Sequence, residues 1–153
     1  MDLILWRHAE AFEMREVQDD LDRALTPKGE RQAQRMADWL NRQMPSSVRV
    51  LASPARRAQQ TAAALERKVK TVAELAPGAS VEALLHAVRW PDGRDSVLVV
   101  GHQPIIGQAV AYLLAGQVEP WPLRKGGVWW LRSRERGGHR QVVLHAVMSP
   151  ELL

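Results

Sequence analysis

Two histidines stand where short apolar runs end. His8 follows residues 3–6 and Arg7, and His102 follows residues 97–101. Short apolar runs that alternate with amphipathic segments predict parallel strands, and such sheets bind ligands beyond the carboxyl ends of their strands. A neutral imidazole can attack phosphorus, and arginine binds phosphate oxygens through paired N–H groups. The two segments therefore indicate a site that handles a phosphoryl group.

A third segment has the same layout. Ser53 and Pro54 follow the apolar run 48–52, and Arg56 and Arg57 come soon after. If the three strands are parallel, all three polar clusters meet at one edge of the sheet. The cations would then stabilise the charge of the transferring phosphoryl group, and the helices predicted after the second and third clusters would add backbone N–H donors.

Length and composition bound the class of protein. We expect a single domain over residues 1–153, since this length suffices for one hydrophobic core. The sequence contains no cysteine, which excludes disulfides and thiolate chemistry and fits a cytoplasmic location. The apolar run before Arg7 is too short for a signal peptide or a membrane span.

The formal net charge of +4 favours anionic substrates. Lysines and arginines are scattered, except for Arg132, Arg134 and Arg136, and aromatic residues do not alternate with them. We therefore expect neither nucleic acid nor a membrane as a partner.

The hydrophobic pattern predicts alternating strands and helices. Strands are expected at 2–6, 48–52, 69–74 and 97–100, and helices at 27–44, 54–68, 80–89 and from 104 onward. Residues 9–25 indicate a loop. Two late strands, 126–132 and 140–147, are expected to form a hairpin with its turn at Gly137 and Gly138. The pattern predicts a three-layer α/β/α fold whose sheet is mostly parallel with a late antiparallel addition.

Four segments resemble the motifs of the histidine phosphatase superfamily, which has the fold of cofactor-dependent phosphoglycerate mutase. They are Arg-His-Ala-Glu at 7–10, Leu-Thr-Pro-Lys-Gly-Glu-Arg-Gln-Ala at 25–33, Ser-Pro-Ala-Arg-Arg-Ala-Gln-Gln-Thr at 53–61, and Val-Gly-His at 100–102. The resemblance implies a phosphoglycerate mutase-like fold. It further implies that His8 is the nucleophile that becomes phosphorylated, and that Arg7, Arg57 and His102 complete the phosphate pocket. Arg57 is selected over Arg56 because it directly precedes the Ala of the third motif.

Within the superfamily, the chain is most similar to the SixA-type phosphohistidine phosphatases. It has little material for a lid, so an open site could admit a histidine displayed on another protein. A phosphoimidazole leaves as a neutral ring once its other nitrogen is protonated, and so needs less from a general acid than an alkoxide does. We therefore predict a metal-independent, cofactor-free phosphatase that acts on phosphohistidine in a protein.

Two alternatives stay open. A phosphatase for small phosphate esters would use the same fold and the same residues. A non-catalytic module would recognise phosphorylated partners without turnover, although the intact set of His8, Arg7, Arg57 and His102 argues against it. The sequence indicates neither the physiological substrate nor the oligomeric state.

Several residues have uncertain roles. Ala9 replaces the glycine that usually follows the histidine, and its methyl group could crowd a phosphate oxygen. No residue clearly occupies the family's acid position, and Glu74 is either the proton donor or an ordinary strand-end carboxylate. Glu10 and Lys125 are candidate substrate contacts, and holding the geometry of the loop is the simpler role for Glu10.

Two further groups have structural explanations. Ser53 is better explained as a helix cap than as a nucleophile, because no Gly-x-Ser-x-Gly turn surrounds it. Trp121, Trp129 and Trp130 could form a partner-binding surface, but core packing explains them more simply.

Overall fold

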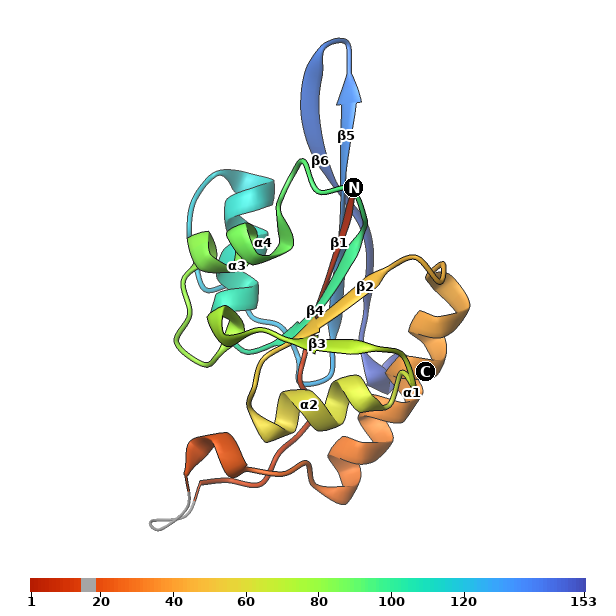
Figure 1. The fold of residues 1–153 in the computed structure, drawn as a ribbon, viewed down its shortest axis with the longest axis vertical. Coiled ribbons are helices and arrows are strands. Elements are labelled where there is room, and N and C mark those ends of the chain that lie inside the picture. The colour runs from red at the N-terminus through yellow and green to blue at the C-terminus, as the bar shows by residue number, and fades with distance from the viewer. Residues whose placement is uncertain (15–18) are drawn as a thin grey trace.

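Six strands form one mixed sheet in the computed structural model, which describes residues 1–14 and 19–153 (Figure 1). The strand order is β3-β2-β4-β1-β5-β6. The first four strands in this order are parallel, while β5 runs antiparallel to β1 and β6 antiparallel to β5. The strands are β1 Asp2–Arg7, β2 Arg49–Ala52, β3 Val69–Thr71, β4 Val97–Gly101, β5 Val128–Arg136 and β6 His139–Met148. The predicted α/β class is confirmed, with a two-stranded antiparallel addition.

Helices cover both faces of this sheet. The four are α1 Pro27–Gln43, α2 Arg56–Ala63, α3 Val81–Val88 and α4 Ile105–Ala115. Alternate residues of a strand point to opposite faces, so β1 contributes to two separate cores. Ile4 and Trp6 pack with residues of α1 and α2, whereas Leu3 and Leu5 pack with residues of α3 and α4. This division gives the predicted three layers.

Helix α1 begins as the sequence predicts and fixes the loop before it. The Thr26 hydroxyl oxygen accepts a hydrogen bond from the Gly29 backbone N–H at 3.0 Å, and Pro27 occupies the first turn. A Cβ atom at Gly29 would lie only 1.9 Å from the backbone oxygen of Glu10. Glycine at this position therefore lets the chain after β1 lie directly against the helix.

The region between β2 and α3 differs from the prediction. Helix α2 ends at Ala63 rather than near residue 68, because the next N–H groups bond three residues back and the chain turns to bury Leu65. The third strand ends at Thr71 rather than at residue 74. A 3-10 helix then spans Ala73–Leu75, so Glu74 does not end a strand.

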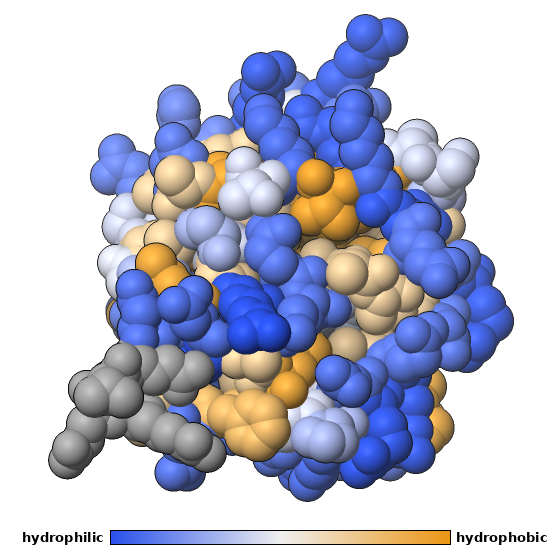
Figure 2. Space-filling model, turned by 60° about the horizontal axis from the view of Figure 1, so that its bottom comes forward, coloured by the Kyte–Doolittle hydropathy of each residue, from blue (hydrophilic) through white to orange (hydrophobic). Residues whose placement is uncertain are grey.

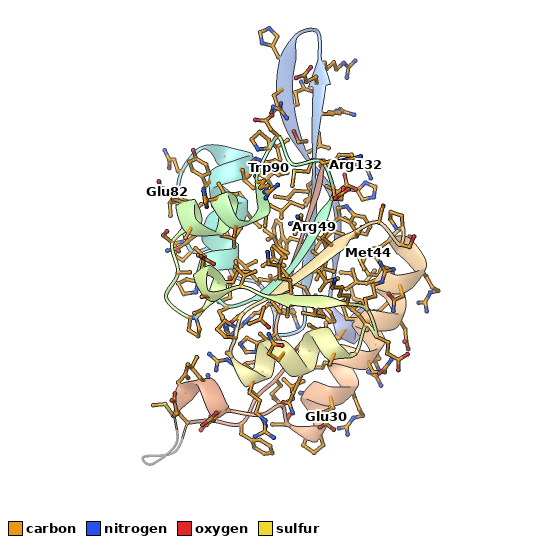
Figure 3. The ribbon with its side chains drawn as sticks, viewed as in Figure 1. Glu30, Met44, Arg49, Glu82, Trp90 and Arg132 are labelled. Carbon is orange, nitrogen blue, oxygen red and sulfur yellow. The ribbon has the colours of Figure 1, made fainter. Side chains whose placement is uncertain are left out.

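The late hairpin forms with the predicted turn. Gly137 and Gly138 have φ angles of 59° and 79°, the positive values that a tight hairpin turn of this kind requires. The end of the hairpin extends beyond the helices (Figure 1). Arg132 of β5, labelled in Figure 3, binds both carboxylate oxygens of Asp2 on β1.

The tryptophans pack inside the fold. Trp130 is buried on the α1 side, whereas Trp129 is partly buried on the α4 side with its ring centroid 6.2 Å from that of Trp121. Core packing therefore explains the positions of these tryptophans. Over the described ranges, no helix has both the length and the hydropathy needed to cross a bilayer.

Candidate active site

The carboxyl ends of β1 and β4 lie side by side and bring the two motif histidines together. Arg7 is in register with Gly101, and the His8 backbone N–H donates to the Gly101 carbonyl oxygen at 3.0 Å. The imidazole centroids of His8 and His102 are 5.2 Å apart. Parallel pairing of these two strands thus places two residues 94 positions apart at one edge of the sheet.

A hollow of about 190 Å³ opens beside the two rings. The lining residues are mostly cationic or polar: Arg7, His8, Ala11, Arg23, Arg57, Pro77, His102, Gln103 and Lys125. Figure 2 shows the end of the molecule that carries this site, where hydrophilic side chains surround small separate apolar areas. In the part of the chain that the structure describes, the lining includes cations and imidazoles but no carboxylate, which suits an anionic ligand.

A larger hollow of about 850 Å³ lies between α3 and α4, bordered by Glu82 and Trp90 (Figure 3). It contains no residue of the matched motifs and only one histidine, His86. The chemistry therefore assigns the candidate site to the smaller hollow rather than to the larger one.

His8 is held through its Nδ1 atom. This nitrogen lies 2.7 Å from the carbonyl oxygen of Ala9, and a carbonyl can only accept, so Nδ1 carries the ring proton. Burial, together with the nearby positive charges of Arg57 and Arg7, lowers the pKa of His8 to about 3. His8 is therefore neutral at pH 7, and its unprotonated Nε2 is available as a nucleophile.

His102 is held through the opposite nitrogen. Its Nε2 atom lies 2.7 Å from the hydroxyl oxygen of Ser53. Its Nδ1 atom is buried and has no hydrogen-bond partner within the described residues. Burial is the main cause that lowers the pKa of His102 to about 4, so this ring is also neutral at pH 7.

Two arginines of the hollow are anchored by carbonyl oxygens. Arg7 donates to the Leu123 carbonyl at 2.7 Å, and Arg57 donates to the Asp20 carbonyl at 2.7 Å. Arg57 is 3% exposed, whereas Arg56 lies at the surface. Burial lowers the pKa of both Arg7 and Arg57, although a guanidinium keeps its charge in proteins.

Three buried side-chain nitrogens lack a hydrogen-bond partner in the described part of the chain. They are Nε of Arg7, Nε of Arg57 and Nδ1 of His102. Buried polar groups are normally paired, and leaving one unpaired costs about 1–3 kcal/mol. All three belong to side chains that line the same hollow. An arginine Nε donates a hydrogen bond, and a histidine Nδ1 does so when protonated, so these atoms are candidate donors to the oxygens of a phosphoryl group.

Asp20 and Arg23 contribute to the site but were not found by sequence reasoning. The Asp20 carboxylate pairs with Arg57 at 3.1 Å and with Arg23 at 3.0 Å. Partial burial alone would raise the pKa of Asp20, but hydrogen bonds and charge from the two arginines outweigh it and lower that pKa. The only signal for Arg23 is its position two residues before the motif that begins at Leu25.

Polar residues of the matched motifs hold the loop that follows β1. The Thr61 hydroxyl accepts from the Ala9 backbone N–H at 3.0 Å and donates to the Arg57 carbonyl at 2.7 Å. Gln32 accepts from the Glu10 backbone N–H at 3.0 Å. The Thr61 bonds connect the segment that carries His8 with the segment that carries Arg57, and the Gln32 bond connects the same loop with α1.

The remaining predicted residues lie in different places. Lys125 lines the hollow, but Glu10 does not: its carboxylate accepts a hydrogen bond from the Thr26 hydroxyl at 2.7 Å, at the start of α1. Glu74 lines a separate hollow with Arg49 and Lys70, because the chain turns away after β3. The structure therefore does not bring Glu74 to the two histidines. Within the described residues, no three His, Asp or Glu side chains are grouped as metal ligands would be.

Comparisons with known proteins agree with this geometry. The model of the histidine phosphatase superfamily (branch 1) matches residues 3–80. Phosphohistidine phosphatase SixA of Escherichia coli strain K12 is 34% identical over 129 residues, which cover 78% of each chain.

Solved structures extend the likeness to the whole fold. The protein histidine phosphatase SixA, solved in complex with tungstate, is 28% identical, with a TM-score of 0.82 and 99% of each chain covered. A mycobacterial glucosyl-3-phosphoglycerate phosphatase, 20% identical, has a TM-score of 0.70 with 94% of this chain and 96% of its own covered. That second likeness concerns the fold alone.

Proposed function

The chain belongs to the histidine phosphatase superfamily, and from this premise we propose that it removes the phosphoryl group from phosphohistidine on a protein, through a phospho-His8 intermediate. The observation that carries the proposal is the set of three unpaired buried nitrogens on side chains that line the same hollow as His8, whose Nε2 is unprotonated. Donors in fixed positions stabilise the charge of a transferring phosphoryl group without having to reorganise.

The reaction has two steps. Nε2 of His8 attacks phosphorus and a new P–N bond forms. The P–N bond to the substrate imidazole breaks, its electron pair stays on that nitrogen, and the ring leaves neutral because its other nitrogen has taken a proton from solvent. Water then attacks the phosphorus of phospho-His8, which releases inorganic phosphate and restores the neutral imidazole. Arg7 and Arg57 hold the phosphoryl oxygens in both steps, because their guanidinium groups match phosphate geometry.

The lining of the hollow favours phosphohistidine over a phosphate ester. Among the described residues no carboxylic acid lines it, and both histidines are neutral at pH 7, so residues 1–14 and 19–153 supply no strong general acid for an alkoxide. A leaving imidazole becomes neutral once its other nitrogen is protonated and needs less help. A hollow of about 190 Å³ accommodates the phosphoryl group and leaves the rest of the substrate outside, as a protein substrate would require.

A small phosphate ester is the second candidate substrate. The rim cations Arg23 and Lys125 could bind an additional anionic group on such a molecule. The fold is shared with a phosphatase named for a sugar phosphate ester, which keeps this candidate in view. A non-catalytic phosphate-binding module is the third reading, and it requires that His8 never becomes phosphorylated.

One set of assays distinguishes the three candidate functions. The wild type, His8→Ala and the control His139→Ala would each be assayed with a phosphohistidine-containing protein and with p-nitrophenyl phosphate. His139 lies on the exposed hairpin, so its variant should behave as the wild type. We expect turnover of the phosphohistidine protein to exceed that of the ester by about tenfold or more in kcat/KM, and His8→Ala to lose both activities.

Faster turnover of the ester would favour the small-molecule phosphatase. Equal, near-zero rates in the wild type and His8→Ala, with phosphate still bound, would favour the binding module.

A further inference from the structure

Ser53 is a fully buried hydroxyl residue directly after β2, and the reaction proposed above gives it no role. Its Oγ atom accepts a hydrogen bond from the Ala55 backbone N–H at 3.1 Å and lies 2.7 Å from Nε2 of His102. Across residues 1–14 and 19–153, these two are the only hydrogen bonds of its side chain. The expected helix cap does not form, because α2 begins at Arg56 with Ala55 as its N-cap residue and no side-chain cap bond. The bond from Ala55 closes a turn before the helix, and the second bond reaches the site.

The hydroxyl proton of Ser53 has one acceptor in this arrangement. The Ala55 N–H is a donor and cannot accept, which leaves Nε2 of His102. A buried O–H without an acceptor is costly, so the proton points at Nε2, and Nε2 must itself be unprotonated. A neutral imidazole carries a single N–H, and the partner of one nitrogen decides which nitrogen that is. The ring proton of His102 is then on Nδ1, which has no acceptor among the described residues, so this tautomer is satisfied at both nitrogens only when an oxygen of a bound ligand meets Nδ1.

The location of Nδ1 gives this assignment a consequence for the site. Nδ1 is one of the three buried nitrogens without a partner, and His102 lines the hollow. With a proton it can donate to a phosphoryl oxygen. Without one, its lone pair would face the lone pairs of that oxygen, and the interaction would be repulsive.

We propose that Ser53 is a positioning residue that holds His102 in the Nδ1–H tautomer, so that an uncharged imidazole donates a hydrogen bond to the phosphoryl group. The tautomer depends only on the contact between Ser53 and His102. Its consequence for turnover rests on the proposed function. A nearly isosteric change at Ser53 should therefore alter the reaction although Ser53 itself does not touch the substrate.

The first test is spectroscopic and needs no substrate. Long-range ¹H–¹⁵N spectra of protein labelled at histidine nitrogens distinguish the two neutral tautomers at pH 7, and loss of a signal set in His102→Gln assigns His102. We expect wild-type His102 to show a protonated Nδ1 and an acceptor Nε2. In Ser53→Ala we expect a shift toward the Nε2–H form, with His8 unchanged as the internal control. Titration with inorganic phosphate should move the Nδ1–H resonance in the wild type.

The second test is kinetic. Ser53→Ala should lower kcat on the phosphohistidine protein by about tenfold and change KM much less, whereas Ser53→Thr, which keeps a hydroxyl, should recover most of the loss. Thermal unfolding of both variants controls for the lost bond to Ala55.

A proton on Nε2 of wild-type His102 would overturn the proposal, and this spectrum decides the matter even if Ser53→Ala does not fold. Unchanged kcat in a folded Ser53→Ala would overturn the catalytic part. Absence of phosphatase activity in the wild type, with the Nδ1–H tautomer observed, would instead refute the proposed function and support the tautomer.

Discussion

A histidine follows each of the strands β1 and β4, and the two imidazole rings are held through opposite nitrogens. At the end of β1, His8 is held through Nδ1 by a backbone carbonyl, 2.7 Å away, which leaves an unprotonated Nε2. At the end of β4, His102 is held through Nε2 by the Ser53 hydroxyl, also 2.7 Å away, which leaves Nδ1. Both rings carry their proton on Nδ1, yet one offers a lone pair to the site and the other offers an N–H.

This difference shows that the residue type alone does not set the role of a histidine. A carbonyl oxygen can only accept, so the tautomer of His8 is fixed by the backbone and cannot be lost through a side-chain substitution. A hydroxyl can donate or accept, so the tautomer of His102 depends on where the Ser53 proton can go. The proposed nucleophile is therefore held by the main chain, and the proposed donor by a replaceable side chain.

The largest expected effects come from replacing either histidine, and they differ because only one of the two variants can still form a phospho-enzyme. His8→Ala should lower turnover by roughly 10⁴-fold or more, because no nucleophile remains. His102→Ala should lower it by about 10²–10³-fold, since it removes one donor to the phosphoryl group. Trapping of acid-labile phosphate should detect phospho-enzyme in His102→Ala and none in His8→Ala. Trapped phosphate in His8→Ala would mean that the assignment of the nucleophile is wrong.

Acid should destabilise the protein through both histidines. Their folded pKa values, about 3 for His8 and about 4 for His102, are below the ordinary value of 6.5. As pH falls below 6.5, the unfolded chain takes up protons that the folded chain does not, so stability present at pH 7 is lost progressively until about pH 3 to 4. Between pH 7 and pH 5 each histidine should lower the free energy of unfolding by about 2 kcal/mol.

Urea unfolding of the wild type, His8→Ala and His102→Ala at pH 7, 6 and 5 measures this loss. Each variant should show a pH dependence smaller by one histidine's share, and the two shares should be similar in this range. They should diverge only below about pH 5, where His102 begins to protonate in the folded state before His8. A pH dependence that neither variant changes would show that the burial of these rings does not control their titration.

The Thr61 hydroxyl bonds to the loop that follows β1 and carries His8, so a change at Thr61 tests the β1 side of the comparison. Thr61→Val keeps the shape of the side chain but leaves the Ala9 N–H without its acceptor, so we expect a loss of about 1–3 kcal/mol in the free energy of unfolding. Thr71→Val is the matched control: its hydroxyl accepts only a solvent-exposed hydrogen bond from Gln59 at 3.1 Å, so stability should change by less than about 0.5 kcal/mol. If the two variants lose the same amount, the bond from Ala9 does not hold the loop.

The sequence was informative where periodicity or a motif fixes a position. Arg7, His8 and His102 stand at the ends of apolar runs, and the run 97–100 is fully buried in the sheet. Parallel pairing then follows from alternation of strands and helices, so their convergence was predictable. Thr61 belongs to a matched motif, but only the folded chain reveals that its hydroxyl joins Ala9 to Arg57.

Contacts made by irregular segments could not be predicted in the same way. Asp20 lies in a stretch without hydrophobic periodicity and meets Arg57 across 37 residues of sequence. Glu74 was expected at a strand end because residues 69–74 were interpreted as one strand. The strand stops at Thr71, and the Val72 N–H bonds to the Ala52 carbonyl at 2.9 Å before the chain turns. Such choices depend on tertiary hydrogen bonds that a one-dimensional pattern does not contain.

The smallest expected effect concerns Lys125, a rim cation on the β1 side. The next residue, Gly126, donates its N–H to the His8 carbonyl at 3.0 Å, and Lys125 lines the hollow without a hydrogen bond or an ion pair to any described residue. An exposed charge attracts an anionic substrate mainly at long range, so Lys125→Ala should raise KM by about threefold and leave kcat unchanged. The effect should disappear at high salt.

Lys68→Ala, far from the hollow, is the control and should match the wild type. Because Lys125 does not touch Ser53 or His102, its effect should add to that of Ser53→Ala in the double variant. A tenfold fall in kcat would instead mean that Lys125 binds the phosphoryl group in the transition state, and the β1 side would then supply a donor as well as the nucleophile.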